Sequence, residues 1–228
     1  MTKNLLVVEK ILSANDRIAS ENRNIFDAEG IKTFNIMASP GAGKTSLIEQ
    51  TIKHLLPKMR LAVIDGDIAT SIDADRAQAA GALAVQINTG GECHLDAVMI
   101  NSALKQMNLT NIDAIIIENV GNLVCPASFQ LGSHKSILIA SVPEGDDKPY
   151  KYPGTYESMD VILLNKIDLL PYVPFRMDYF ERGSRALNSA ANFIPISCTT
   201  GAGMDVWTGW ILDEIQNFRA SIAQQPHI

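Results

Sequence analysis

The sequence predicts a three-layer α/β fold in which helices cover both faces of a mostly parallel sheet. Short, continuously apolar runs alternate along the chain with stretches of helical periodicity. These runs are apolar at successive positions, which is typical of strands buried on both faces. The stretches between them are long enough for the helical crossovers that parallel pairing requires. The three observations together predict strands that share one sheet.

The first expected element is an amphipathic helix over about residues 7–28, because its apolar residues form an imperfect helical stripe that Gly30 ends. Packing on the sheet or on a partner is its expected role. The other elements of this half are a strand over 31–38, a helix over 44–56 that stops before Pro57, a strand over 60–64, a helix over 71–80 and a strand over 83–87.

The second half continues the alternation, and we expect one domain over residues 1–228. A long loop over 119–134 has no regular pattern, which is typical of a functional segment. The elements expected around it are a helix over 93–107, strands over 114–117, 136–141 and 161–164, a helix over 177–191, a strand over 193–196 and a helix over 204–222.

Composition excludes several classes of partner. The chain of 228 residues has a net charge of −6 and no basic run, which argues against nucleic acid or an anionic membrane as the main partner. No apolar segment is long enough to span a membrane and the N-terminus lacks a signal-peptide pattern, so we expect a cytoplasmic protein. The three cysteines are far apart, and a disulfide framework is not expected.

The loop after the first strand is typical of a phosphate-binding loop that opens a helix. Its backbone N–H groups would surround a β-phosphate, and the Lys44 ammonium would span the β- and γ-phosphates. The Thr45 hydroxyl would bind Mg²⁺. Ala38 stands where the usual pattern has glycine, which suggests ordinary strand conformation there. The residues expected to bind the nucleotide here are Pro40, Gly41, Ala42, Gly43, Lys44, Thr45 and Ser46. The predicted fold is therefore that of a P-loop NTPase.

A second motif predicts that the base is guanine. Asn165-Lys166-Ile167-Asp168 follows an apolar strand, and the Asp168 carboxylate can accept hydrogen bonds from the N1–H and exocyclic amine of guanine, a pair that adenine lacks. Lys166 would lie along the base, and Asn165 would brace the loop. Ser197 and Cys198 resemble a second guanine loop, which makes Cys198 structural rather than a metal ligand.

Acidic residues near two other strand ends are candidates for metal binding and hydrolysis. Glu118 ends an apolar strand and is expected to bind Mg²⁺ through water, and Gly121 is expected to sense the γ-phosphate. Asp67 is the first candidate for binding Mg²⁺ or positioning the attacking water, with Asp73 and Asp75 as alternatives. A simple role at a helix N-terminus is equally compatible with these acids. The residues expected to carry catalysis are Lys44, Asp67 and Glu118.

Cys93, His94 and Cys125 suggest a second metal site. Two thiolates and an imidazole suit a soft or borderline ion such as Ni²⁺ or Zn²⁺. Spacing alone favours packing over ligation, because cysteine is often buried as a small apolar residue.

Five segments together closely resemble the nickel-incorporation GTPases of nickel–iron hydrogenase maturation, the hydrogenase maturation factor B family. These segments are Asn15 with 21–23, then 39–45, 88–97, 118–127 and 144–148. The resemblance implies a GTP- and metal-dependent homodimer that delivers nickel to the hydrogenase large subunit precursor with a small zinc-bearing metallochaperone. It also implies that the shared nickel or zinc site is made by Cys93, His94 and Cys125.

Two other interpretations stay open at this stage. A urease-type nickel GTPase is second, because the Cys-Pro-His triplet usual in those proteins is absent. The chain is otherwise either a slow switch GTPase that gates metal transfer or a metal-buffering protein whose dimer the nucleotide stabilises. Lys148 is a candidate for reaching the partner subunit's nucleotide, although a solvated loop lysine is its commoner role.

Overall fold

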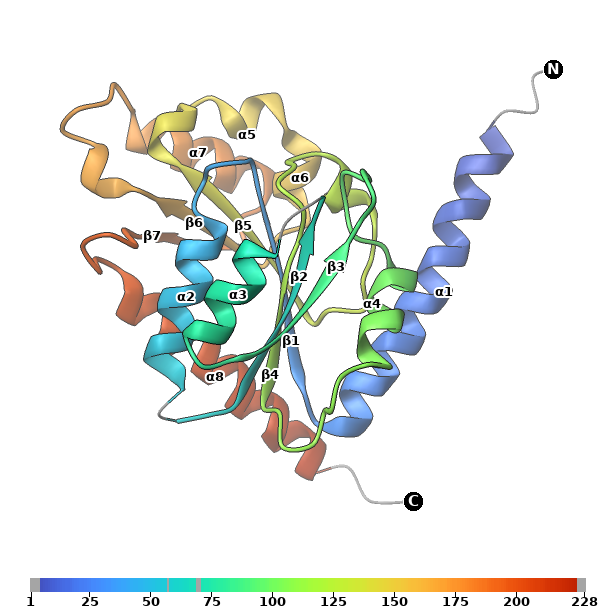
Figure 1. The fold of residues 1–228 in the computed structure, drawn as a ribbon. Helices are drawn as coiled ribbons and strands as arrows, with labels where there is room; N and C mark the ends of the chain where they lie inside the picture. Colours follow the sequence, from blue (N-terminus) through green and yellow to red (C-terminus); the bar gives the residue numbers. More distant parts are fainter. Residues whose placement is uncertain (1–4, 57, 69–70, 225–228) are drawn as a thin grey trace.

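Seven strands form one sheet in the order β3-β2-β4-β1-β5-β6-β7, and every neighbouring pair is parallel (Figure 1). The structure is a computed structural model that describes residues 5–56, 58–68 and 71–224, with only the backbone of 5–11. The strands are β1 Lys32–Ala38, β2 Leu61–Asp67, β3 Leu83–Asn88, β4 Ala114–Glu118, β5 Lys135–Ser141, β6 Val161–Asn165 and β7 Asn192–Pro195. The predicted α/β fold is confirmed, and the sheet is parallel throughout rather than mostly so.

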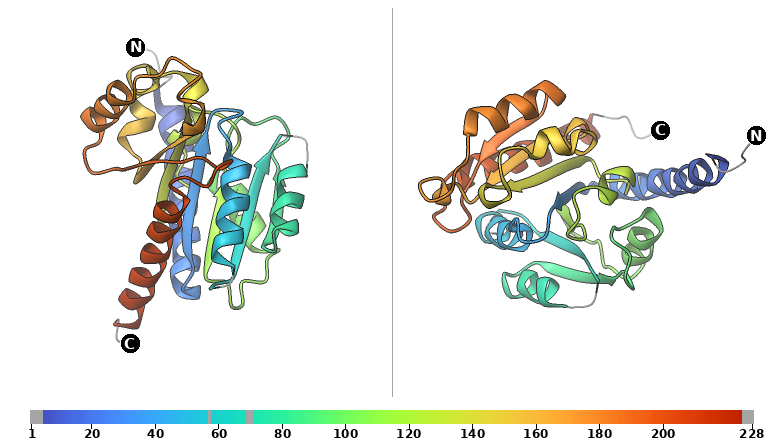
Figure 2. Two further views of the ribbon diagram at one scale, coloured as in Figure 1. Left: turned by 90° about the vertical axis from the view of Figure 1, so that its left-hand side faces the viewer. Right: turned by 90° about the horizontal axis from the view of Figure 1, so that it is seen from above.

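Helices cover both faces of this sheet, as Figure 2 shows in two further views. The helices are α1 Leu5–Glu29, α2 Lys44–Leu55, α3 Ile72–Ala79, α4 Ala97–Leu104, α5 Lys148–Lys151, α6 Pro153–Glu157, α7 Met177–Leu187 and α8 Met204–Ala223. Short 3₁₀ turns, Cys125–Ser128, Val142–Glu144 and Ile167–Leu169, lie in the connections. The layered arrangement follows from the helical crossovers between parallel strands.

The core divides according to the two faces of the strands. Side chains such as Phe34 and Ile116 pack with α2, α3 and α8 in one cluster, which includes the fully buried Trp207. Alternate strand residues such as Ile115 point to the other face, where they pack with Phe26 of α1 and with α4. The strands on the β5–β6 side pack there with α6 and α7. Both faces of the sheet are therefore buried, as the continuous apolar runs predict.

Several boundaries differ from the prediction for local reasons. Strand β2 continues to Asp67 instead of ending at residue 64, because it stays paired with β3 from Ala62 to Asp67. Helix α4 begins at Ala97 rather than 93, because the Asp96 carboxylate caps it by accepting a 2.8 Å hydrogen bond from Met99 N. Helix α7 ends at Leu187 rather than 191. Helices α5 and α6 are absent from the prediction, since each is only a turn or so long.

Helix α1 projects beyond the body on which it packs. Its first turns extend beyond the rest of the molecule, whereas its C-terminal half lies beside α4 (Figures 1 and 2). The predicted stripe residues Val8 and Ile11 fall outside the residues whose side chains are described, as does Pro57, the predicted stop of α2. No helix in the described ranges is long and apolar enough to cross a bilayer.

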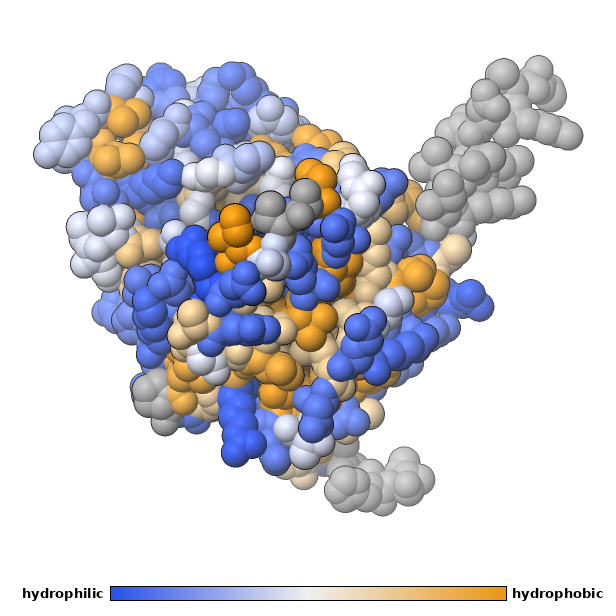
Figure 3. Space-filling model, viewed as in Figure 1, coloured by the Kyte–Doolittle hydropathy of each residue, from blue (hydrophilic) through white to orange (hydrophobic). Residues whose placement is uncertain are grey.

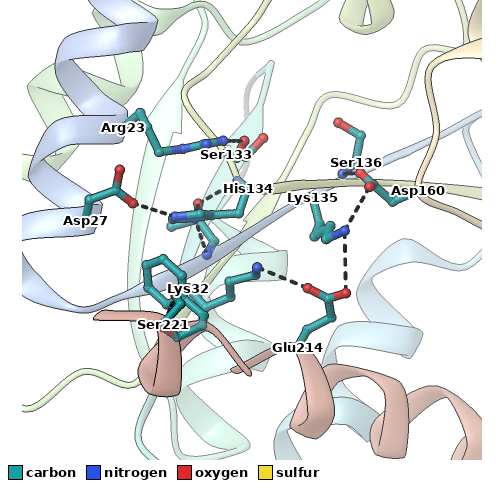
Figure 4. Close-up of polar contacts among 12 residues, drawn as sticks. Arg23, Asp27, Lys32, Ser133, His134, Lys135, Ser136, Asp160, Glu214 and Ser221 are labelled. Atoms are coloured by element: carbon teal, nitrogen blue, oxygen red, sulfur yellow. Dashed lines mark hydrogen bonds and ion pairs between the residues drawn. The ribbon is translucent and has the colours of Figure 1, made fainter. Parts of the chain in front are cut away.

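A partly buried polar cluster fastens α1 and α8 to the amino ends of β1 and β5 (Figure 4). His134 Nδ1 accepts a 3.0 Å hydrogen bond from the backbone N–H of Thr33, so Nε2 carries the proton and donates to Asp27 Oδ1 at 2.8 Å. Burial lowers the pKa of His134 to about 4. Lys32 Nζ lies 3.0 Å from Glu214 of α8. This cluster is at the edge of the sheet opposite to the predicted site.

Trp207 is the largest fully buried side chain among the described residues, and its Nε1–H donates a 2.8 Å hydrogen bond to Thr51 Oγ1 of α2. Trp207→Ala should lower the free energy of unfolding by about 3–5 kcal/mol, because it opens a cavity between α8, α2 and the sheet. Urea unfolding measures this change. Val206→Ala, at an exposed neighbouring position, is the control and should change it by no more than about 0.5 kcal/mol. Equal effects of the two substitutions would contradict this account of the core.

Candidate functional site

The phosphate-binding loop connects β1 to α2 at the carboxyl edge of the sheet. Ala38 is the last residue of β1, as its side chain predicts. Gly41 and Gly43 have φ angles of 76° and 104°, which glycine adopts without strain. A Cβ at Gly43 would also collide with the Asn165 side-chain amide. The loop therefore needs glycine at this position for two independent reasons.

The predicted base-binding loop holds the phosphate loop in place. Asn165 Nδ2 donates to Ala42 O at 2.9 Å, and Lys166 Nζ donates to Gly41 O at 2.6 Å. The amide oxygen, Asn165 Oδ1, accepts from the backbone N–H groups of Lys166 at 2.7 Å and Cys198 at 3.3 Å. The two predicted nucleotide motifs and the Ser197–Cys198 loop are thus one connected unit.

A cavity of about 190 Å³ lies where these loops meet. Its lining residues are Gly43, Ser46, Glu49, Gln50, Arg76, Asn165, Lys166, Cys198 and Thr199. Nearby, Ser197 Oγ donates a 2.6 Å hydrogen bond to Asp168 Oδ1, which orients the carboxylate. Burial raises the pKa of the Cys198 thiol to about 11, so it stays protonated. A neutral thiol is consistent with the structural role expected for Cys198.

Three acids form a compact group beside the phosphate loop. The carboxylate oxygens of Asp65, Asp73 and Glu118 lie within 4.8 Å of one another. Asp65 and Glu118 are paired in the register of β2 and β4, which places both on the face toward α2. Thr45 Oγ1 donates to Glu118 Oε1 at 2.9 Å, whereas Asp65 Oδ2 is buried without a hydrogen-bond partner among the described residues.

The electrostatics of this group favour a bound cation. Burial first, and then Asp73 and Asp67, raise the pKa of Asp65 to about 7. Burial first, and then Asp65, raise the pKa of Glu118 to about 8, while Lys44 acts in the opposite direction for both. An all-oxygen group with an unpartnered carboxylate oxygen suits Mg²⁺. Sequence reasoning does not single out Asp65 from the Asp65-Gly66-Asp67 run, because strand pairing with Glu118 is not visible locally.

Gly66 separates these aspartates for a steric reason. A Cβ there would lie 2.6–2.7 Å from three atoms of the Leu95 side chain, which covers the end of β2. Asp67 is the last residue of β2 and only partly buried, and it lies outside the compact acid group. Asp73 belongs to the group, whereas Asp75 accepts a 3.2 Å hydrogen bond from Ser71 Oγ.

The segment after Glu118 lies against the phosphate loop and the segment before α4. A Cβ on Gly121 would lie 3.4 Å from Pro40 Cα and 3.5 Å from Lys44 Nζ. Asn119 Oδ1 accepts a 3.1 Å hydrogen bond from the backbone N–H of Leu95. Farther along, Leu123 O accepts a 2.8 Å hydrogen bond from the buried Thr155 hydroxyl of α6. This segment therefore contacts three separate parts of the carboxyl edge.

Cys93, His94 and Cys125 are brought together at the end of this segment. Cys93 Sγ lies 3.7 Å from His94 Nδ1, and a hydrogen bond with the Cys125 thiol raises the pKa of the exposed Cys93. Asn122 Nδ2 donates to Cys93 O at 3.2 Å, and the His94 ring stacks on Phe129 with centroids 3.9 Å apart. Cys93 thus contacts both of the other predicted metal ligands, although Cys125 is far from it in the sequence. The ligand atoms of all three do not lie within 4.8 Å of one another, unlike those of the acid group.

Lys148 is anchored within its own subunit. Its Nζ lies 4.0 Å from Glu144 Oε1 and 5.2 Å from the centroid of the Tyr152 ring. The idea that it reaches a partner's nucleotide stays a prediction.

Comparison with known proteins agrees with this geometry. A family model described as the CobW/HypB/UreG nucleotide-binding domain matches residues 32–195. The hydrogenase maturation factor HypB of Rhizobium leguminosarum bv. viciae is 44% identical over 208 residues, which cover 91% of this chain and 70% of that protein. This chain belongs to the CobW/HypB/UreG family, among the HypB proteins.

Solved HypB structures have the same fold. The crystal structure of HypB from Helicobacter pylori in complex with nickel has a TM-score of 0.86 and 34% identity, and the match covers 94% of this chain and 99% of that one. HypB from Archaeoglobus fulgidus gives a TM-score of 0.84 and 35% identity, with 90% and 100% covered.

The buried acids predict a pH dependence of stability in the absence of metal and nucleotide. In the unfolded chain Asp65 and Glu118 ionise near their ordinary pKa values of 3.8 and 4.5, whereas in the fold they keep their protons until about pH 7 and 8. Between these limits the folded state binds more protons, so stability is lost as the pH rises and levels off above the folded pKa values. The thermal midpoint should fall by about 5–10 °C between about pH 6.5 and 8.

The buried His134 acts in the opposite direction, but only below this window. Its pKa is lowered from 6.5 to about 4, so its effect on stability is confined to the range between those values. The double variant Asp65→Asn, Glu118→Gln is the control and should have a midpoint that stays nearly level above about pH 6.5. A thermal scan in which both proteins follow the same pH profile would show that these carboxyls do not carry the effect.

Proposed function

We propose that this protein is a GTP-hydrolysing nickel metallochaperone that gates nickel delivery during hydrogenase maturation. The observation that carries the proposal is the single segment 118–125, which begins at the acid group, passes the phosphate loop and ends at Cys125. Its HypB relatives are named hydrogenase maturation factors, and one solved relative is a complex with nickel. A segment shared by nucleotide and metal sites is suited to coupling them.

Nucleotide choice in this proposal depends on Asp168. Its carboxylate, held by the Ser197 hydroxyl, accepts from the two donors of guanine, and Lys166 lies along the base. The Asn165 amide sets the distance between base and phosphates, because it bonds both loops. Adenine lacks these two donors, so the hydrogen-bonding positions of the Asp168 carboxylate that face the base would stay unfilled, which disfavours adenine.

Hydrolysis in this proposal converts GTP and water to GDP and phosphate at a slow, switch-type rate. The Lys44 ammonium stabilises charge on the transferred phosphoryl group, and Gly121 leaves room for it beside Pro40. Thr45, Asp65 and Glu118 would hold Mg²⁺, which supplies positive charge to the phosphates when bound. Asp67 or Asp73 orients the attacking water.

Nickel is the cargo, and Cys93, His94 and Cys125 bind it, with Zn²⁺ as a competing ion. Cys93 is exposed, which suits transfer to a partner. We further propose that two copies pair across this edge when GTP and metal are bound. Exposed apolar residues around the site support a contact there: Ile68 is 49%, Ile72 61% and Val124 54% exposed. Figure 3 shows apolar residues among charged ones over α3 and β3, on the side of the molecule that is seen in Figure 1.

The partners in this proposal are a small zinc-bearing nickel metallochaperone and the hydrogenase large subunit precursor.

Asp168→Asn tests the choice of guanine. The substitution exchanges an acceptor for a donor, and it should cost about 1–3 kcal/mol of discrimination for GTP over ATP. Competition titrations with a fluorescent guanine nucleotide measure both affinities. Asp178→Asn, on the exposed side of α7, is the matched control. Wild-type protein that binds ATP as tightly as GTP would refute the assignment.

Turnover measured with and without Ni²⁺ tests the coupled function. Lys44→Ala should reduce GTP hydrolysis at least about 100-fold, because it removes the main cation at the phosphoryl group. Lys53→Ala, on the same helix but paired with Glu49 at the surface, should hydrolyse GTP normally. Cys125→Ala should keep turnover and lose its response to Ni²⁺. Hydrolysis that is unchanged in Lys44→Ala, or a Ni²⁺ response that persists in Cys125→Ala, would contradict the proposal.

A further inference from the structure

The side of α1 that faces α4 carries polar residues that the proposed nucleotide chemistry does not use. Asn15 is 6% exposed and Asn22 is fully buried. Buried amides need hydrogen-bond partners, and most of theirs are backbone groups of two distant segments. One of these segments follows Cys93 and His94 in the chain, and the other follows Cys125.

Asn15 joins the two segments with one side chain. Its Oδ1 accepts a 2.9 Å hydrogen bond from the backbone N–H of Ala97, and its Nδ2 donates to Gln130 O at 2.8 Å. Ala97 follows Cys93 and His94 in the chain, and Gln130 follows Cys125. The two halves of the metal site are therefore tied to a common point on α1.

Asn22 and Arg23 extend the same attachment about two turns farther along α1. Asn22 Nδ2 donates to Ala97 O at 2.9 Å and to Leu131 O at 3.2 Å. Arg23 Nε donates to Gly132 O at 2.7 Å. A Cβ at Gly132 would run into the α1 backbone, so this loop lies flat on the helix. Of these attachments, the one made by Asn15 reaches the loop nearest in sequence to Cys125.

We propose that Asn15 is a positioning residue that sets the spacing between the Cys93–His94 segment and the Cys125 segment, and thereby the affinity and geometry of nickel binding. The inference rests on the proposed function and deepens it. Metal ligands tolerate only small errors in position, and residues that orient them influence affinity strongly. Other contacts also join the two segments. Asn22 on α1 bonds Ala97 O and Leu131 O, and Asn119 Oδ1 accepts from Leu95 N–H. At the surface the segments meet through the Asn122–Cys93 hydrogen bond and the His94–Phe129 stack.

The chemistry of the amide gives a selective test. An ionised aspartate accepts hydrogen bonds but cannot donate them. Asn15→Asp would keep the bond from Ala97 N–H and lose the bond to Gln130 O, which removes the attachment to α1 nearest in sequence to Cys125 and leaves those of Asn22 and Arg23. Asn15→Leu, of similar size and without charge, would lose both bonds and serves if the aspartate variant does not fold.

Asn188 provides a matched control at the end of α7. Its Nδ2 donates to Met159 O at 2.8 Å, and its Oδ1 accepts from Ala190 N at 3.1 Å, so it has the same two-sided amide role away from the metal segments. Asn188→Asp should disturb local stability in the same way without changing metal binding.

The experiment is a Co²⁺ and Ni²⁺ titration of the full chain, followed by thiolate-to-metal absorption bands under conditions where the new carboxyl is ionised. Asn15→Asp should bind Ni²⁺ about tenfold more weakly and show altered Co²⁺ ligand-field bands, whereas Asn188→Asp should match wild type. Asn15 variants with wild-type affinity and spectra would overturn the positioning role. Wild-type bands that persist in Cys93→Ala would instead overturn the proposed metal site, so the two failures are distinguishable.

Discussion

The parallel register that places Asp65 of β2 beside Glu118 of β4 is the constraint on which the rest of the site depends. Two carboxyls buried side by side are costly, and Lys44 is a nearby cation that opposes the upward shift of their pKa values. The fold tolerates them because each carboxyl can stay protonated, and therefore neutral, near neutral pH. The same register points Glu118 at Thr45 and starts the segment toward Cys125.

Local sequence is sufficient to predict a part of the site when all of the residues that form that part lie in one continuous segment. The glycines of the phosphate loop, Lys44 and the Asn165–Asp168 run all lie where their motifs predict, because each motif needs only a strand, a turn and a helix in succession. Asp65 is not predicted as a site residue, because its position beside Glu118 results from pairing with a strand far along the chain. The predicted start of α4 is wrong for a smaller reason: the helical pattern continues back past Asp96, and only the structure shows that this residue is a cap.

Asn15 illustrates what sequence cannot assign. It belongs to the segments that carry the family resemblance, but nothing in residues 7–28 indicates that its amide meets Ala97 and Gln130. Those contacts exist because α1 lies beside α4 on one face of the sheet. The segments that carry Cys93, His94 and Cys125 are thus attached to each other at the carboxyl edge of the sheet through Asn119, and also to a helix that projects from the body.

The His134 cluster gives the two edges of the sheet different responses to acidity. The Thr33 N–H fixes His134 in one tautomer, and His134 stays neutral throughout the physiological pH range. The hydrogen bonds that it makes at the amino edge therefore persist over that range. The carboxyl edge titrates near neutrality through Asp65 and Glu118. A fall in pH through neutrality therefore adds protons to the oxygens that the proposed Mg²⁺ would use, while His134 between α1 and α8 stays neutral.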